Sequence, residues 1–157
     1  MRVLLVCQAN TARSVMAQLL LERLLRERGA DGRVTVRSAG VGRWARDRML
    51  ASHDARIVLR EEGIHLAEDG FVSTALHAHP ELLAEADLVV TMTLEQVPVV
   101  EALAAGRRLR IVTLRELAGE RGDIADPAGQ GEDVFRACRD EIKRCLVKAV
   151  ERLTRGG

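Results

Sequence analysis

The chain has no tyrosine, and aromatic residues make up only 2% of its 157 residues. Aliphatic side chains must therefore build the core, and aromatic platforms on which nucleic-acid bases could stack are ruled out. The chain also lacks an excess of charge of one sign, because it has 24 basic and 23 acidic residues and a net charge of +1. No overall field attracts nucleic acid or a membrane surface, so local groups must hold any anionic ligand.

Long hydrophobic runs are absent as well, and no stretch approaches the length needed to cross a bilayer. The apolar start is too short for the core of a secretory signal and lacks a small-residue cleavage site. We therefore expect a cytoplasmic protein. Three cysteines, an odd number, fit reduced thiols better than a disulfide framework. A chain of this length can bury a core as one domain, residues 1–157.

Strand and helix patterns alternate along the chain, which predicts an α/β fold. We expect one three-layer domain in which a four-stranded parallel sheet carries helices on both faces. The expected strands are residues 3–6, 33–37, 87–92 and 109–112, with a turn at 38–40. Helices are expected at 16–28, at 49–62, from 80 onward for a short stretch, and at about 132–153. Another helix is expected after Thr93, which can cap it, with Pro98 distorting this helix or confining it to the residues beyond. Residues 65–79 and 119–131 are expected to be loops.

The first seventeen residues read as strand, loop and helix. An apolar run ends in Cys7, and a small, polar segment leads through Arg13 and Ser14 into the first helical pattern. A thiol at this place faces backbone N–H groups and the positive end of a helix dipole. These groups and the neighbouring guanidinium favour the thiolate, which is the nucleophilic form of cysteine.

The spacing Cys-x5-Arg-Ser at Cys7, Arg13 and Ser14 suits an oxyanion site. Five residues suffice to curl one turn of backbone around a tetrahedral oxyanion, so that successive N–H groups converge on its oxygens. Arg13 can bind two of these oxygens at once, and the Ser14 hydroxyl can stabilise the thiolate by hydrogen bonding.

The same cysteine-to-arginine spacing occurs a second time, at Cys138 and Arg144. There a helical pattern forbids a curled loop, and one helix face is formed by Val134, Cys138, Ile142, Cys145 and Ala149. We therefore interpret Cys138 and Cys145 as apolar core residues. The surrounding residues, rather than the spacing, distinguish the two cases.

With these segments in view, the sequence resembles the low-molecular-weight protein tyrosine phosphatase family over nearly its whole length. The similar segments are the strand into residues 7–14, Ser38-Ala39-Gly40, residues 86–92 and Asp126-Pro127. The resemblance implies that Cys7 attacks phosphorus, that Arg13 stabilises the transferring phosphoryl group, and that Asp126 protonates the leaving group and then activates water. It also implies that phosphate contacts the loop residues Gln8, Ala9, Asn10, Thr11, Ala12, Arg13 and Ser14. No metal or cofactor is implied.

The resemblance gives three further residues a supporting role. Asn10 is similar to the residue that fixes the loop shape, often in a left-handed conformation, and Ser38 to its hydrogen-bond partner. Trp44 lies where relatives often carry an aromatic wall of the substrate cleft, although a partly buried core position fits it equally well.

Several positions depart from the family pattern. Many relatives carry a second loop cysteine that forms a disulfide with the nucleophile, and this chain has Ala12 there. The family histidine that supports the loop asparagine has no counterpart in residues 68–73. Residues 128–130 replace aromatics that help to bind substrate, so we expect a wider or less aromatic cleft. Gln8-Ala9 replaces a more common pair that ends in glycine.

The substrate class remains open between several alternatives. Thr11 lies in a segment that resembles the Asn-Thr-Cys-Arg-Ser loop of bacterial protein arginine phosphatases, which modestly favours phosphoarginine over phosphotyrosine in a phosphorylated protein. Inorganic phosphate would then be the product and a competing ligand. The seven-residue spacing of Cys138 and Cys145 leaves arsenate reductase as a third alternative. A non-enzymatic module that binds phosphoproteins or senses redox state is the fourth alternative. His77 and His79 lack a third ligand, so we expect no metal site there.

Overall fold

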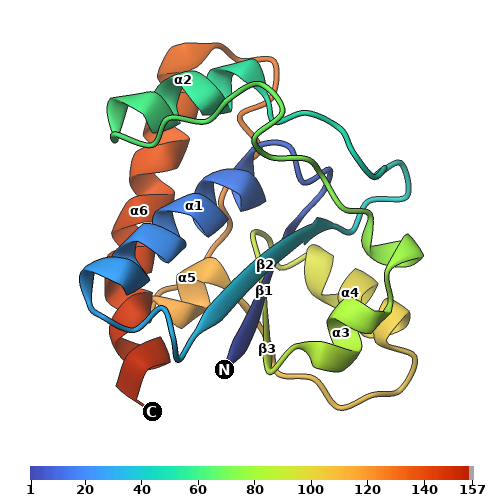
Figure 1. Ribbon diagram of the computed structural model, residues 1–157. Coiled ribbons are helices and arrows are strands. Elements are labelled where there is room, and N and C mark those ends of the chain that lie inside the picture. The colour runs from blue at the N-terminus through green and yellow to red at the C-terminus, as the bar shows by residue number, and fades with distance from the viewer. Residues whose placement is uncertain (156–157) are drawn as a thin grey trace.

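The computed structural model describes residues 1–155 and contains one parallel sheet with the strand order β2-β1-β3-β4 (Figure 1). The predicted α/β architecture is confirmed. The strands are β1 (Arg2–Cys7), β2 (Thr35–Gly40), β3 (Leu88–Thr91) and β4 (Ile111–Thr113). The helices are α1 (Arg13–Glu27), α2 (His53–Glu61), α3 (Glu81–Glu85), α4 (Gln96–Ala104), α5 (Leu114–Leu117) and α6 (Glu132–Arg155), with a 3-10 turn at Leu76–Ala78.

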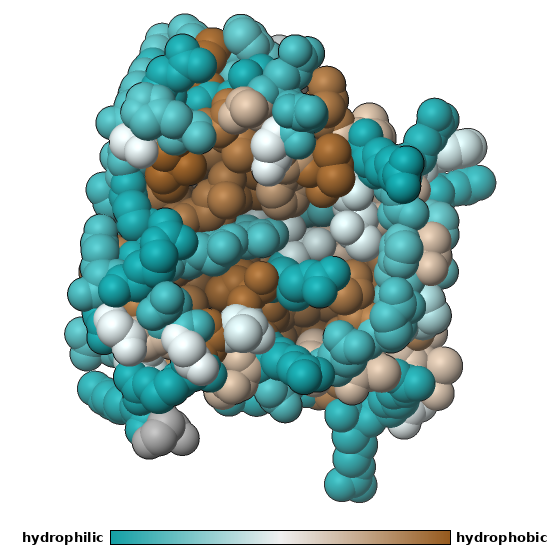
Figure 2. All heavy atoms as spheres, in the orientation of Figure 1, coloured by the Kyte–Doolittle hydropathy of each residue, from teal (hydrophilic) through white to brown (hydrophobic). Residues whose placement is uncertain are grey.

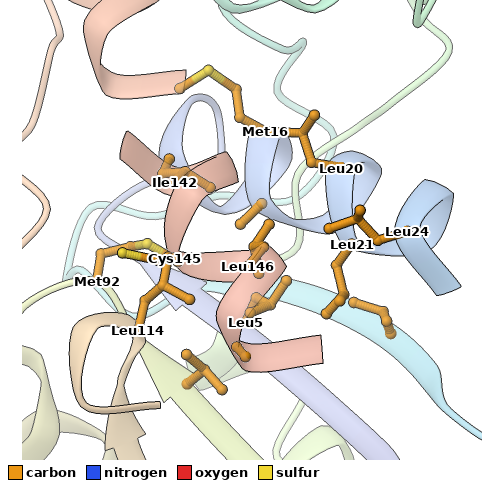
Figure 3. Packing of buried hydrophobic residues seen from close by; sticks show 14 of the residues in the cluster. Leu5, Met16, Leu20, Leu21, Leu24, Met92, Leu114, Ile142, Cys145 and Leu146 are labelled. Atoms are coloured by element: carbon orange, nitrogen blue, oxygen red, sulfur yellow. The ribbon is translucent and has the colours of Figure 1, made fainter. Parts of the chain in front are cut away.

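The sheet separates two apolar clusters, as the alternation of side chains along a strand requires. On one face, Leu5 packs among side chains of α1 and α6, including Leu20 and Leu146 (Figure 3). On the other face, Leu4 and Val6 pack in the cluster that α3 and α4 complete. Both clusters are almost entirely aliphatic, as the shortage of aromatic residues predicts.

The strand order places β1 at the centre of the sheet, between β2 and β3. The chain leaves β1 for β2 on one side and later crosses to β3 on the other, so a topological switch point lies at the carboxyl end of β1. Parallel sheets commonly bind ligands at such a point. Cys7 pairs with Gly40 and Val6 with Thr91 in register, which brings the loops after β1, β2 and β3 to one edge.

Two segments between β2 and α2 differ from the sequence-based expectation. Residues 38–40 belong to β2 rather than to a turn, because they pair with the last three residues of β1. The helix expected at 49–62 begins only at His53. Leu50 forms an antiparallel bridge with Val72, and Ser73 N donates to Met49 O, so the backbone of this segment is engaged outside a helix.

The expectation for α4 was also partly wrong. Pro98 is the third residue of the helix. The first N–H groups of a helix have no acceptor within it, so the N–H group that proline lacks costs no hydrogen bond there. Thr93 does not cap it. Instead, the side-chain carbonyl of Gln96 accepts hydrogen bonds from Met92 N and Thr93 N and holds the turn that precedes the helix. The short helix α5 was not expected, although a capping box of Thr113 and Glu116 begins it.

The last helix, α6, packs across α1, α2 and α5 (Figure 1). Cys138, Ile142 and Cys145 lie on its buried face, as predicted, but Val134 does not, because its side chain is exposed and Phe135 is buried in its place. Among residues 1–155, no helix combines the length and the apolar character needed to span a membrane.

Candidate active site

The segment from Cys7 to Ser14, the Cys7 loop, curls from the end of β1 into the first turn of α1. Cys7 is 3% exposed, and Asn10 and Ser14 are fully buried. The Sγ atom of Cys7 lies 2.9 Å from the Oγ atom of Ser14. The strand, the loop and the helix start therefore follow the sequence prediction closely.

In residues 1–155, the carbonyls of Gln8 and Thr11 accept hydrogen bonds from protein groups, but the loop N–H groups after Cys7 do not donate to any. Within residues 1–155, none of the N–H groups from Gln8 to Ser14 donates a hydrogen bond to another protein atom. Backbone N–H groups need an acceptor, which for these donors must come from solvent or from a ligand. A run of such donors at a helix N-terminus suits an oxyanion, whose oxygens would accept several of them.

Asn10 fixes the shape of this loop. Its φ angle is 60°, in the left-handed region that asparagine tolerates better than most residues. Its Nδ2 atom donates to Ser14 Oγ at 2.7 Å and to Ser38 Oγ at 3.0 Å, while its Oδ1 atom accepts from Thr74 N at 2.9 Å. The backbone of Thr74 thus supplies support that the residues at 68–73 do not.

The donor and the acceptor of each hydrogen bond beneath the loop can be assigned from their partners. Ser38 Oγ donates to the side-chain carbonyl of Gln18 on α1, so Ser38 accepts from Asn10. Ser14 also accepts from Asn10, which leaves its own hydroxyl hydrogen for Cys7 Sγ. This order of donors directs the Ser14 O–H at the Cys7 sulfur, as an attacking thiolate would require, because a thiolate can only accept hydrogen bonds.

The end of β2 lies against the Cys7 loop with almost no space between them. Gly42 N donates to Gln8 O at 2.9 Å, and Val41 N donates to Cys7 O at 2.9 Å. A Cβ atom at Gly40 would lie 2.9 Å from the carbonyl carbon of Ala9. Only glycine therefore allows this approach, which explains why Gly40 ends the strand.

Arg13 connects the Cys7 loop to the loop of residues 119–131. Its guanidinium is buried, donates to Ile124 O at 2.8 Å, and lies 3.7 Å from a carboxylate oxygen of Asp126. Ile124 N donates to Met92 O beyond the end of β3. The predicted pair of Arg13 and Asp126 is therefore brought together across more than a hundred residues of sequence.

The Asp126 carboxylate opens onto a hollow of about 440 Å³, here called the Asp126 hollow. Its lining residues are Gln8, Arg13, Thr93, Glu95, Gln96, Val99 and Asp126. The wall is polar apart from Val99 and contains no aromatic side chain, in line with the expectation of a less aromatic cleft. Trp44 is not a core residue, since 75% of its surface is exposed, and it lies beside the guanidinium of Arg43.

The other sequence candidates do not line the Asp126 hollow, although Cys138 Sγ lies 3.9 Å from the carbonyl oxygen of Ala125, next to Asp126. Cys138 and Cys145 are buried in α6, and burial raises the pKa of the Cys138 thiol to about 12. His77 Nε2 lies near the carbonyl of Ala45, and His79 lies between two carboxylates. Over residues 1–155, no group of three or more His, Cys, Asp or Glu side chains is arranged to hold a metal ion.

The sequence is also related to a known protein family. Residues 2–156 match the family model described as low molecular weight phosphotyrosine protein phosphatase. The chain belongs to this family. The solved structure of a YwlE arginine phosphatase, a cysteine-to-serine mutant with a phosphorylated active site serine, has a TM-score of 0.88 and 32% sequence identity, covering 99% of this chain and 97% of that one.

Named relatives of the phosphatase family include enzymes with two different substrate classes. A protein-arginine-phosphatase of Bacillus subtilis is 34% identical over 154 residues, which cover 98% of this chain and 97% of the relative. The low molecular weight protein-tyrosine-phosphatase PtpB of Staphylococcus aureus is 25% identical over 150 residues, covering 94% of this chain and 96% of the relative.

Sequence reasoning missed three contributors to this phosphatase-family site. Gln18 lies outside the recognisable loop, and only its position one turn into α1 could have indicated that it faces Ser38. Thr74 acts through a backbone amide, which leaves no mark in the sequence. Glu95 lies in the turn between β3 and α4, where no motif marks it as a residue that lines the Asp126 hollow.

We predict that Gln18→Leu slows the alkylation of Cys7 by iodoacetamide at neutral pH by about fivefold, the size expected for one lost hydrogen bond. Without the Gln18 carbonyl, the Ser38 hydroxyl no longer has a fixed acceptor, and the hydroxyl that faces Cys7 loses its orientation. Burial raises the pKa of the Cys138 thiol to about 12 and also raises the pKa of Cys145, so both thiols stay protonated at neutral pH and contribute little to the measured rate.

Gln18→Glu is the matched control, since it keeps an acceptor at the same place and should keep the alkylation rate. Thermal unfolding of both variants separates orientation of the thiolate from loss of stability. If the two variants react equally slowly, or if Leu leaves the rate unchanged, Gln18 does not orient this network.

Proposed function

We propose that this protein is a phosphoprotein phosphatase that acts through a phosphocysteine intermediate, with phosphoarginine as the favoured substrate. The observation that carries the proposal is the run of unpartnered N–H groups from Gln8 to Ser14 around the buried thiol of Cys7. These donors, with the Arg13 guanidinium, would hold the three non-bridging oxygens of a phosphoryl group. The products would be the dephosphorylated protein and inorganic phosphate.

In the first step the Cys7 thiolate attacks phosphorus, an S–P bond forms, and the bond to the leaving group breaks. The Ser14 hydroxyl, 2.9 Å from the sulfur, holds the thiolate before attack and is held in turn by Asn10. A phosphorylated serine in the active site of the related cysteine-to-serine YwlE mutant supports a phosphorylated enzyme at this position.

Asp126 supplies the proton that the leaving group takes. Its carboxyl lies on the rim of the hollow, close to Arg13 and therefore close to the bond that breaks. In the second step the same carboxylate accepts a proton from water, which attacks phosphorus and breaks the S–P bond. Arg13 positions the acid by binding both Ile124 O and the carboxylate.

The composition of the hollow supports phosphoarginine rather than phosphotyrosine. Two carboxylates, Glu95 and Asp126, line it together with the Arg13 guanidinium, amides and a hydroxyl, and Val99 is its one aliphatic wall. A guanidinium leaving group gains from the negative charge, whereas a phenol ring gains from apolar and aromatic contacts that this wall lacks. The arginine-directed relatives with about one third identity support the same substrate class.

The alternatives from the sequence receive less support. An arsenate reductase needs mobile thiols that can reach the nucleophile in turn, but Cys138 and Cys145 are held inside the continuous helix α6. A module that only binds or senses phosphoproteins needs no acid beside the thiol, whereas Asp126 lies next to Arg13.

The proposed function is tested by phosphate release from matched peptides that carry phosphoarginine or phosphotyrosine. We expect a higher kcat/KM for phosphoarginine, and we expect Cys7→Ser to bind phosphate while releasing none from either peptide. Retention of more than a trace of activity by Cys7→Ser would contradict the phosphocysteine mechanism, and a preference for phosphotyrosine would contradict the substrate assignment.

A second prediction concerns the role of Asp126 as general acid. Asp126→Asn should lower kcat by roughly a hundredfold on phosphoarginine and on other poor leaving groups, within the range typical of proton transfer. The same change should have a much smaller effect on an activated aryl phosphate, which leaves without a proton. An equal loss on both substrates would instead indicate a structural role.

A third prediction concerns Thr11 as the residue that selects the substrate. Thr11→Ile should lower kcat/KM for phosphoarginine relative to phosphotyrosine by about tenfold, the lower end of what pocket shape usually contributes. Thr11 O accepts from Ser52 N at 2.8 Å, a backbone contact that the change leaves in place. An unchanged ratio of the two kcat/KM values would exclude Thr11 as the selector.

A further inference from the structure

The loop that follows β2 carries an unusual group of exposed cations. Residues 43–48, here called the arginine loop, read Arg-Trp-Ala-Arg-Asp-Arg, and all three arginines are exposed. Within residues 1–155, their side chains make no hydrogen bond or ion pair, in contrast to the helix arginine Arg136, which pairs with Glu61. Figure 2 shows hydrophilic side chains projecting from the right-hand edge, where Figure 1 draws this loop.

The only carboxylate of the arginine loop does not neutralise these charges. Asp47 accepts a hydrogen bond from Ala75 N at 2.8 Å, and its other oxygen lies 2.8 Å from Nε2 of His79. The amide of Ala75 and the imidazole of His79 lower the pKa of Asp47, and Asp47 raises the pKa of His79. The carboxylate is therefore already paired, and three positive charges remain available.

The backbone of the arginine loop is held by neighbouring segments. Arg48 N donates to Ser73 O at 2.9 Å, Ala45 N donates to Gly42 O at 3.0 Å, and the Ser73 hydroxyl donates to Arg46 O. Arg48 has a φ of 65°, a conformation that a residue with a side chain adopts only when its surroundings impose it. A fixed backbone that presents mobile cationic side chains binds a partner at a lower entropic cost.

The arginine loop begins at the edge of the candidate active site. Gly42, the residue before it, bonds to Gln8 of the Cys7 loop through its backbone N–H. A second hollow of about 560 Å³, which Arg43 helps to line, shares Gln8 and Val99 with the Asp126 hollow. One continuous surface therefore leads from Asp126 to Arg43, the first residue of the arginine loop.

We propose that the arginine loop binds an acidic segment of the protein substrate, next to the phosphorylated residue. The proposal rests on the proposed function and adds a preference for the sequence around the phosphorylation site. An extended peptide advances about 3.3 Å per residue, so a few residues lead from the phosphoryl group to the loop. A single exposed ion pair contributes little binding free energy, but three together favour a substrate in which acidic rather than neutral residues flank the phosphorylated residue.

An acidic polypeptide fits this surface better than a nucleic acid does. Glu95 and Asp126 line the adjoining hollow, and they would repel a continuous chain of phosphates that ran across both hollows. A polypeptide can place its acidic residues at the arginine loop and a cationic guanidinium beside the two carboxylates.

The test compares two phosphopeptides that differ only in three flanking residues, Asp and Glu in one and Asn and Gln in the other. The triple variant R43Q, R46Q and R48Q should lose about tenfold in kcat/KM on the acidic peptide, mainly through a higher KM. It should change less than twofold on the neutral peptide and on an aryl phosphate. High salt should remove the advantage of the acidic peptide in the unmodified enzyme.

The matched control is the triple variant R107Q, R108Q and R110Q. These exposed arginines precede β4 and lie at the opposite edge of the sheet, so the net charge changes equally but far from the site. The control should behave like the unmodified enzyme on both peptides. A similar loss in both triple variants, or an equal loss on both peptides, would overturn the proposal.

Further arms of the experiment separate the remaining outcomes. The same flanks are placed around phosphotyrosine, so that a failure of the phosphoarginine assignment still leaves a substrate on which the flanks can be compared. A short single-stranded oligonucleotide is added as competitor. If it inhibits turnover through the arginine loop while acidic flanks have no effect, the loop binds nucleic acid and the proposal is wrong.

Discussion

The left-handed turn at Asn10 is the constraint on which the candidate site depends. Among residues 1–155, the backbone N–H groups around this turn, from Gln8 to Ser14, have no protein acceptor. Such a conformation persists only when other interactions hold it. Three segments hold it here: the start of α1 through Ser14, the end of β2 through Ser38, and residue 74 through its amide. Without them the loop would lose its curl.

Burial of the Arg13 guanidinium determines the placement of the acid. A buried cation must be paired or fully hydrogen-bonded, and Arg13 meets this demand with Ile124 O and the carboxylate of Asp126. The group that would bind phosphate therefore also fixes the group that would protonate the leaving atom. Ile124 is held in turn by Met92 at the end of β3, so the sheet sets the position of a loop that has little regular structure of its own.

The charges around the site are separated although the chain is nearly neutral. Glu95 and Asp126 give the hollow a negative wall, while the arginine loop gives the neighbouring surface a positive one. The two surfaces meet along a boundary formed by Gln8 and Val99. A substrate is then oriented by its charge pattern as well as by its phosphoryl group, which net charge cannot reveal.

The sequence by itself determined much of this protein. The continuous apolar run of β1, the small and polar residues after Cys7 and the following helical period were sufficient to predict the α/β fold and to place Cys7 and Arg13 in one loop, and the family resemblance added Asn10. These signals are local, because the periodicity of a strand or helix and the curl of an anion-binding loop depend on residues close together in the chain. Only the tertiary structure decided where β2 ends, where α2 begins, that Gln18 orders the hydrogen bonds beneath Cys7, and that Thr74 supports Asn10. Each of these depends on contacts between segments 20 to 64 residues apart, and backbone groups in such contacts carry no residue-specific signal.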